Sequence, residues 1–127
     1  MPHCSNTNKR TAMQAYIDRM NAGDLAGVVA LYADDATIED PVGSGKIITG
    51  KAAIEEFYKG SLQTKAQLKL SAPIRTSHSD SAAMAFEVTL DWGSLMTISV
   101  IDVMTFNEQG QFTSMRAYWG PEDMRKH

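Results

Sequence analysis

Apolar residues recur at spacings of three and four through the first half of the chain, which is the period of an α-helix. This spacing predicts a first helix over 9–21, ended by Gly23, and a second helix capped by Asp24. A third helix is expected to begin at Thr49 or Gly50. The inward-facing residues of the three helices are Met13, Tyr16, Ile17 and Met20; Leu25, Val28, Val29 and Tyr32; and Ile54, Phe57, Tyr58 and Leu62.

After residue 64 the helical spacing gives way to an alternation of apolar and polar residues, which predicts strands. A short strand is also expected over 36–40, between a turn at 34–35 and Pro41, which cannot donate to a neighbouring strand. The later alternating segments are 68–72, 84–92, 96–106 and 112–119. Helices followed by mostly antiparallel strands indicate an α+β fold in which a curved sheet wraps around the helices.

The composition is that of a globular protein with one domain. The 127 residues are 43% apolar and 21% charged, so a domain over 1–127 is expected, with a loose segment over 1–8. A net charge of -3 argues against nucleic acid as a partner. The single Cys4 excludes an internal disulfide, and the apolar runs are too short for a membrane span. We therefore expect a cytoplasmic protein with no membrane partner.

Asp102 is the most informative polar residue. Counting by twos places it in the middle of a strand face that otherwise presents apolar side chains such as Val100 and Met104. Burial of a carboxylate is costly and raises its pKa, so Asp102 is a candidate for a neutral acid that donates a hydrogen bond near pH 7. Two structural interpretations stay open: an ion pair with Arg116, and a strand bulge that turns Asp102 to solvent.

Asp40 is a second charged residue on an apolar strand face, at the end of the strand expected over 36–40. It shares a face with Ala36 and Ile38 and directly precedes Pro41. A carboxylate at a strand end keeps some solvent and stays ionised, which suits a general base. A turn-forming aspartate before proline is the structural alternative.

Tyrosine hydroxyls are the third polar feature of the predicted interior. Tyr16 lies on the inward side of the first helix, and Tyr32 and Tyr58 lie on inward positions of the other two. A buried hydroxyl needs a partner, so the three phenols are expected to meet, or each to bond a backbone carbonyl.

These groups together provide the two hydrogen-bond donors and the base that are needed to remove a proton next to a carbonyl. Tyr16 and a neutral Asp102 supply two donors for one developing oxyanion, and Asp40 carries the proton. This chemistry requires no metal, because the donors replace the Lewis acid. The expected wall is apolar and fits a bulky apolar substrate; it consists of Phe57, Phe86, Val88, Met104, Met115 and Trp119.

Three segments connect these residues to a known family: YADDATIEDP at 32–41, VIDVM at 100–104 and MRAYW at 115–119. Together they resemble the bacterial ketosteroid isomerases. The first segment is also typical of the wider superfamily of cone-shaped α+β proteins, called NTF2-like or SnoaL-like, whereas the aspartate within VIDVM is far more specific. The resemblance extends over most of the chain between residues 16 and 119, and it implies a conical, curved sheet closed by three helices.

The resemblance also implies a role for each central residue. Asp40 matches the base that moves a proton from C4 to C6 of a 3-oxo-Δ5-steroid. Tyr16 and a protonated Asp102 match the donors to the C3 oxygen, and Tyr32 and Tyr58 match tyrosines that support the oxyanion tyrosine. The family works without a cofactor and as a homodimer. The resemblance also matches Phe57, Phe86, Met115 and Trp119 to residues that form the walls around the steroid.

Other functions on the same fold remain alternatives at this point. An epoxide hydrolase or cyclase would need an arginine between two aspartates, and alternation places Arg116, the one candidate, on the opposite face from Met115. A dehydratase would need histidines in the pocket, and His78 is expected in a turn. A non-catalytic binding module predicts an apolar residue in place of Asp40 or Asp102.

Overall fold

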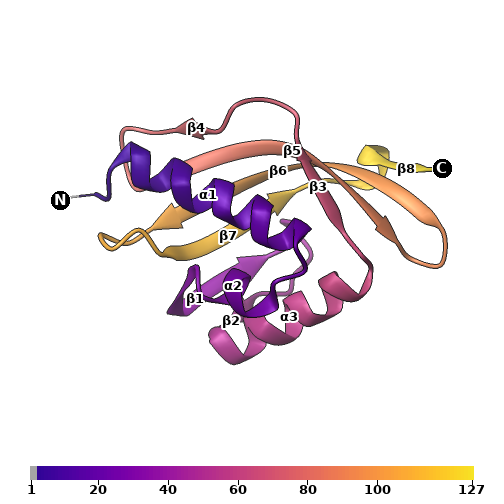
Figure 1. Cartoon of the computed structure of the whole chain (residues 1–127), viewed down its shortest axis with the longest axis horizontal. Helices are drawn as coiled ribbons and strands as arrows, with labels where there is room; N and C mark the ends of the chain where they lie inside the picture. The colour runs from indigo at the N-terminus through magenta and orange to yellow at the C-terminus, as the bar shows by residue number, and fades with distance from the viewer. Residues whose placement is uncertain (1–2) are drawn as a thin grey trace.

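The computed structural model describes residues 3–127 (Figure 1). Its helices are α1 (Asn6–Asn21), α2 (Leu25–Val29) and α3 (Lys51–Gln63), with a short 3-10 helix, η1 (Pro121–Asp123). Its strands are β1 (Tyr32–Glu39), β2 (Ile48–Thr49), β3 (Gln67–Leu70), β4 (Arg75–Thr76), β5 (Ser81–Asp91), β6 (Leu95–Phe106), β7 (Phe112–Tyr118) and β8 (Met124–Lys126).

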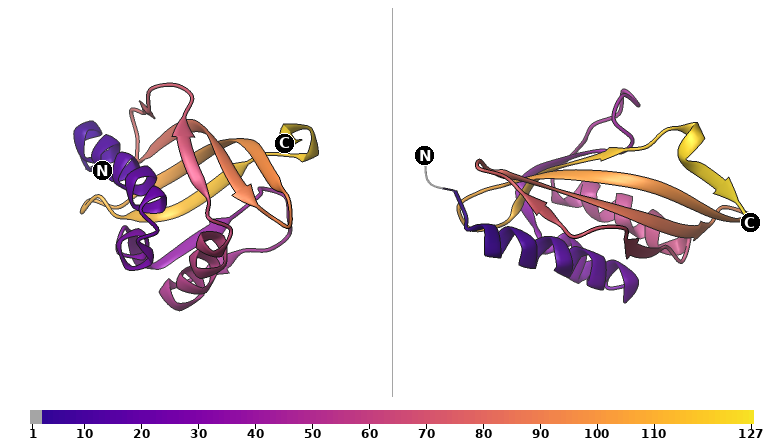
Figure 2. Two further views of the ribbon diagram at one scale, coloured as in Figure 1. Left: turned by 45° about the vertical axis from the view of Figure 1, so that its right-hand side comes forward. Right: turned by 90° about the horizontal axis from the view of Figure 1, so that it is seen from above.

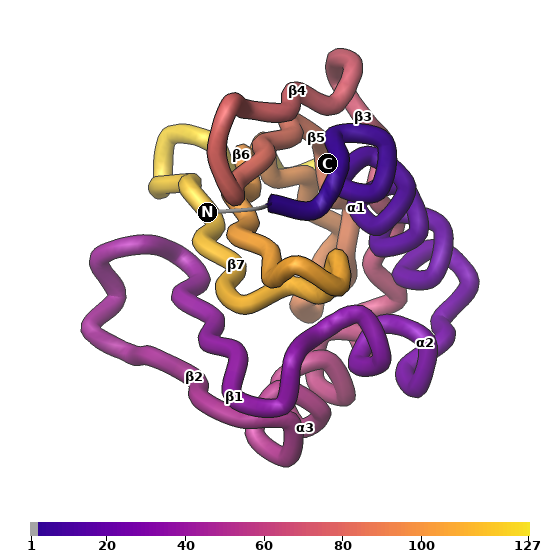
Figure 3. The backbone as a smooth tube through the Cα atoms, turned by 90° about the vertical axis from the view of Figure 1, so that its left-hand side faces the viewer, coloured from indigo at the N-terminus to yellow at the C-terminus, as the bar shows by residue number. Residues whose placement is uncertain are grey.

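The strands form one curved sheet in the order β2-β1-β7-β6-β5-β3, with β4 paired to β5 and β8 paired to β6. Strands β1 and β7 are parallel, and the other pairs are antiparallel. Helices α1 and α3 lie on the same side of this sheet (Figure 2), and α2 packs against both of them (Figure 3). This arrangement confirms the predicted α+β fold, with three helices on a curved, mostly antiparallel sheet.

The first helix begins earlier than the apolar spacing predicts. The Ser5 side chain accepts a hydrogen bond of 3.0 Å from the Asn8 backbone, which caps α1. Lys9 is buried, and its ammonium group donates to the Ser79 carbonyl, which anchors the start of α1 to the loop before β5. The expected loose segment over 1–8 is therefore wrong for residues 6–8, and residues 1–2 lie outside the described residues.

The second helix is shorter than predicted. It ends at Val29, and Tyr32 belongs to β1 because it pairs with Phe112 of β7, so the pairing of strands overrides the helical spacing. The expected turn at 34–35 is also wrong. Asp34 and Asp35 lie within β1, where the register with β7 shifts, and both are exposed there.

Two features of the described residues bear on partners. No helix in residues 3–127 is long and apolar enough to cross a membrane. No group of three histidine, cysteine, aspartate or glutamate side chains in this range is arranged to hold a metal ion.

Candidate active site

A pocket lies between the helices and the sheet, and its wall is mostly apolar. Helices α1 and α3 form one side, and strands β3, β5, β6 and β7 form the other. The polar residues that line it are Tyr16, Asp40, Tyr58, Ser61, Thr64 and Asp102. The pocket therefore brings together the three residues that the sequence singled out as catalytic candidates.

Asp102 occupies the centre of the inner face of the sheet. It pairs in regular register with Met84 of β5 and Ala117 of β7, and only 1% of its surface is exposed. Within the described residues, neither of its carboxyl oxygens has a hydrogen-bond partner. Burial raises the pKa of Asp102 well above its ordinary value, and the nearby charge of Asp40 raises it further. Both effects favour the neutral, protonated form of Asp102 over its charged form.

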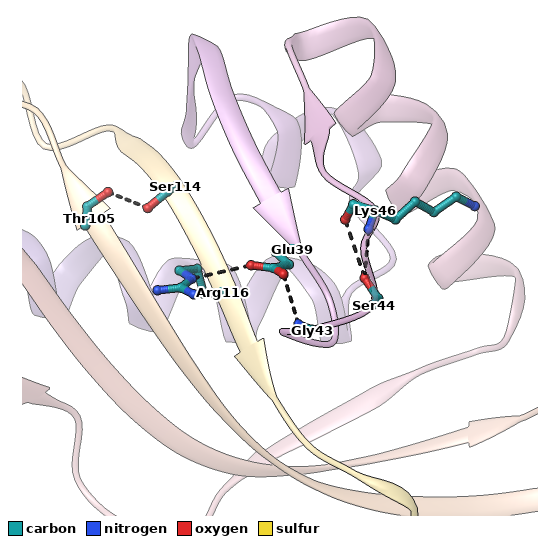
Figure 4. A network of polar contacts seen from close by, with 7 residues as sticks. All are labelled: Glu39, Gly43, Ser44, Lys46, Thr105, Ser114 and Arg116. Carbon is teal, nitrogen blue, oxygen red and sulfur yellow. Dashed lines mark hydrogen bonds and ion pairs between the residues drawn. The ribbon is translucent and has the colours of Figure 1, made fainter.

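Both structural alternatives for Asp102 are wrong. The Arg116 guanidinium lies 3.6 Å from the carboxylate of Glu39 (Figure 4). This pair lies on the other face of β7 from Met115, so it is remote from the pocket. The bulge in the pairing of β6 with β7 lies between Thr105 and Phe106, beyond Asp102.

The three predicted tyrosines form one buried chain of hydroxyls. The Tyr58 hydroxyl donates to Tyr16 across 3.1 Å, and the hydroxyls of Tyr32 and Tyr58 lie 2.5 Å apart. Burial raises the pKa of all three phenols. Because Tyr16 accepts from Tyr58, its own proton remains available to a group in the pocket. Tyr32 joins this chain from β1 rather than from a helix.

Asp40 follows the last residue of β1 and faces the pocket. The Trp119 indole nitrogen donates a hydrogen bond of 2.7 Å to its Oδ1. Burial raises the pKa of Asp40, and the bond from Trp119 lowers it in part. The sequence indicated Trp119 only as a wall residue. Its bond to Asp40 depends on the parallel pairing of β1 with β7, which local sequence patterns do not reveal.

The predicted wall agrees with the structure except at one position. Phe57, Phe86, Val88, Met115 and Trp119 all line the pocket. Met104 does not line it. Met104 lies two residues beyond Asp102 on the same face of β6 and is completely buried against its neighbours Ala82 and Met115.

Several wall residues were missed. Alternation along β6 and β5 already placed Ile98, Val100 and Leu90 on the inner face, and this pattern was the available signal. Ser61 and Thr64 were missed because they are polar. Other lining residues not predicted are Met20, Ala66, Leu68 and Trp92.

Comparison with known proteins places this site in a family. The model of the SnoaL-like domain matches residues 13–115. The chain therefore belongs to the SnoaL-like domain family. It is 46% identical over 116 residues to the steroid Delta-isomerase of Nocardioides simplex, covering 91% of this chain and 92% of that protein. Within the SnoaL-like family, the chain thus groups with a steroid Delta-isomerase over nearly its whole length.

Two further proteins are similar to this chain, one in sequence and one in structure. The chain is 28% identical to the epoxide hydrolase LasB of Streptomyces lasalocidi, over 94% of this chain and 44% of that longer protein. The solved structure of the epoxide hydrolase/cyclase-like enzyme SalBIII, studied for pyran ring formation in the polyether salinomycin, superimposes with a TM-score of 0.91. Its identity is 25%, and the match covers 97% of this chain and 98% of SalBIII.

The burial of Asp102 predicts a pH-dependent cost to stability. The folded protein retains a proton on Asp102 that the unfolded chain loses as the pH rises above about 4, so stability falls over that range. Asp102→Asn removes this titration. We expect the free energy of unfolding of the variant, relative to the parent, to rise by about 1.4 kcal/mol per pH unit above about pH 4, until Asp102 itself ionises.

Urea unfolding at pH 4 to 7 measures this difference. Gln63→Ala, at an exposed position of α3, is the control, because it removes no titratable group and should give a constant difference across the range. A constant difference for Asp102→Asn as well would show that Asp102 is ionised in the folded protein.

Proposed function

We propose that the chain is an isomerase that moves the C5–C6 double bond of a 3-oxo-Δ5-steroid to C4–C5. The single observation that supports this most is the buried, unpartnered Asp102 in an apolar pocket shared with Tyr16 and Asp40. The similarity to a protein named steroid Delta-isomerase, at 46% identity, supports the same reaction.

Asp40 is the general base in this proposal. Its carboxylate removes a proton from C4, and the electron pair of that C–H bond moves into the ring to give a dienolate with its negative charge on the C3 oxygen. Asp40 then returns the proton to C6, which leaves the double bond conjugated with the C3 carbonyl. The proton and the electrons stay with the substrate and Asp40, so the reaction as proposed uses no cofactor.

Tyr16 and Asp102 stabilise the dienolate. Each donates one hydrogen bond to the C3 oxygen as the negative charge develops. The bond that Tyr58 donates to Tyr16 stabilises any charge that Tyr16 gains, and Tyr32 bonds Tyr58 in turn. Removal of one such donor typically costs about a hundredfold to a thousandfold in turnover.

The two carboxyl groups have different environments, which supports different roles. Asp40 accepts a hydrogen bond from Trp119, which favours its charged form, whereas Asp102 has no partner among the described residues and is more deeply buried. The negative charge of Asp40 also favours the neutral form of Asp102. One base and one acid can therefore coexist near neutral pH.

The apolar walls favour a substrate with a large apolar skeleton. Phe57 and Tyr58 come from α3, and Phe86, Val88 and Met115 come from the facing strands. Burial of a rigid apolar ring system here would exclude water from the charged intermediate, which strengthens the hydrogen bonds to it.

A homodimer is part of the proposal. Ile101 of β6 and Tyr118 of β7 are direct neighbours in the sheet, on its outer face, and are 49% and 43% exposed in the single chain. Exposed apolar neighbours of this kind are typical of protein interfaces.

An epoxide hydrolase or cyclase is the second candidate, because a sequence relative and a solved structure with those names are similar to this chain. The geometry of the site favours the isomerase. Arg116 is paired with Glu39, and no arginine among residues 3–127 lines the pocket between its two aspartates. His78 is exposed in a bend and does not line the pocket either, which disfavours a dehydratase.

Asp40→Asn should abolish most turnover while steroid binding persists, because the change removes the proton carrier and preserves the shape. We expect turnover to fall by about a hundredfold to ten-thousandfold. The rate is followed by the ultraviolet absorbance of the conjugated enone, and binding of the product is measured at equilibrium. Glu39→Gln, one residue earlier and outside the pocket, is the control. An Asp40→Asn variant with parental turnover would rule out Asp40 as the base.

Trp119→Phe should raise the pH needed for activity. The change removes a donor that stabilises the charged form of Asp40, so the pKa of Asp40 rises and the acidic limb of the profile of kcat/KM against pH moves to higher pH. Trp92→Phe, also in the pocket wall and without a bond to Asp40, should leave the limb in place. A limb that does not move in Trp119→Phe contradicts the proposed titration of Asp40.

A further inference from the structure

Helix α3 presents a hydroxyl at a position where its pattern calls for an apolar side chain. The inward positions of α3 follow the helical period through Ile54, Phe57, Tyr58 and Leu62. Ser61 lies on the same stripe, at three residues after Tyr58 and seven after Ile54, and it lines the pocket. A polar group in a stripe of this kind needs an explanation, because an apolar residue there would pack better.

The hydrogen bonds of the last turn of α3 leave the Ser61 hydroxyl available. Thr64 Oγ1 donates its proton to the Ser61 backbone carbonyl across 2.6 Å, so the Thr64 hydroxyl has no further proton to offer. The Ser61 hydroxyl makes no hydrogen bond to any of residues 3–127. Of these two hydroxyls, Ser61 is the one that can donate into the pocket.

Along α3, Ser61 lies between Tyr58 and Thr64, and all three residues line the pocket. Tyr58, one turn earlier, bonds to Tyr16 at the catalytic end. Thr64, one turn later, accepts a bond of 2.9 Å at its carbonyl from the backbone of Asp91, next to the half-exposed Trp92. At 1.5 Å per residue, the helix axis advances roughly 4.5 Å from Tyr58 to Ser61 and roughly 9 Å from Tyr58 to Thr64. The axis of α3 therefore runs along the pocket, away from the oxyanion donors.

We propose that Ser61 forms a second polar subsite, which binds an oxygen substituent at the end of the substrate remote from the reacting carbonyl. The inference rests on the proposed isomerase function. For a 3-oxo-Δ5-steroid, that substituent is a carbonyl or hydroxyl oxygen on the five-membered ring, at C17. The rest of the pocket wall is mostly apolar, with residues such as Leu90 and Ile98, so a single hydroxyl there determines which oxygenated steroids are preferred.

A remote subsite acts on binding rather than on chemistry. The bond from Ser61 to a C17 oxygen is the same in the substrate and in the dienolate, because the charge develops at the other end of the molecule. Its loss should therefore raise KM and leave kcat unchanged. If Ser61 had a merely structural role, its substitution would change the kinetic constants for steroids with and without a C17 oxygen alike.

The experiment compares two 3-oxo-Δ5-steroids, one with a carbonyl at C17 and one with a methylene there. Ser61→Ala should lower the ratio of kcat/KM for the first substrate to that for the second by roughly three- to tenfold, through KM alone. Turnover of the C17-methylene substrate should not change. Thr64→Val is the matched control, because its hydroxyl proton is already donated within α3, and it should leave the ratio as in the parent.

The outcomes separate the two proposals. If the parent protein isomerises both steroids and Ser61→Ala leaves the ratio unchanged, the subsite is wrong and the isomerase stands. A ratio that changes equally in Thr64→Val also overturns the assignment to Ser61. If the parent isomerises neither steroid, the proposed function is wrong, and the subsite is rejected with it.

Discussion

The burial of one carboxyl group without a partner is the constraint on which the candidate site depends. Asp102 lies in regular register between β5 and β7, so neither a bulge nor a loop gives it access to solvent. A charged carboxylate in this position would be strongly unfavourable, whereas a protonated acid needs only one acceptor. Under the proposed function, the sheet therefore holds a protonated acid at this position, and the C3 oxygen of the substrate accepts its hydrogen bond.

The remaining polar groups are arranged around that donor by separate elements. Helix α1 brings Tyr16, α3 brings Tyr58, and β1 brings both Tyr32 and the aspartate that follows its end. The bond between Asp40 and Trp119 joins residues 79 positions apart in sequence, across the parallel pair β1–β7. Because these groups come from both helices and strands, the geometry of the site depends on the packing of the whole curved sheet against the helices.

Much of this site was predictable from local patterns. Alternation along 96–106 identified Asp102 as a polar residue on a buried face, and helical spacing placed Tyr16 and Tyr58 inward. Other features depend on contacts between distant segments. Tyr32 fits a helical stripe, yet its pairing with Phe112 makes it a strand residue. Met104 fits the alternation of the inner face, yet it is completely buried and does not line the pocket.

The most direct test of this account is the ionisation state of Asp102 itself. In protein labelled with carbon-13 at the aspartate carboxyl groups, the Asp102 resonance is assigned by its loss in the asparagine variant. Its chemical shift is then followed from pH 3 to pH 8. The account predicts that the resonance stays at the position of a protonated acid at pH 7. A resonance that moves to the carboxylate position with a midpoint near pH 4, the ordinary value for aspartate, would contradict it.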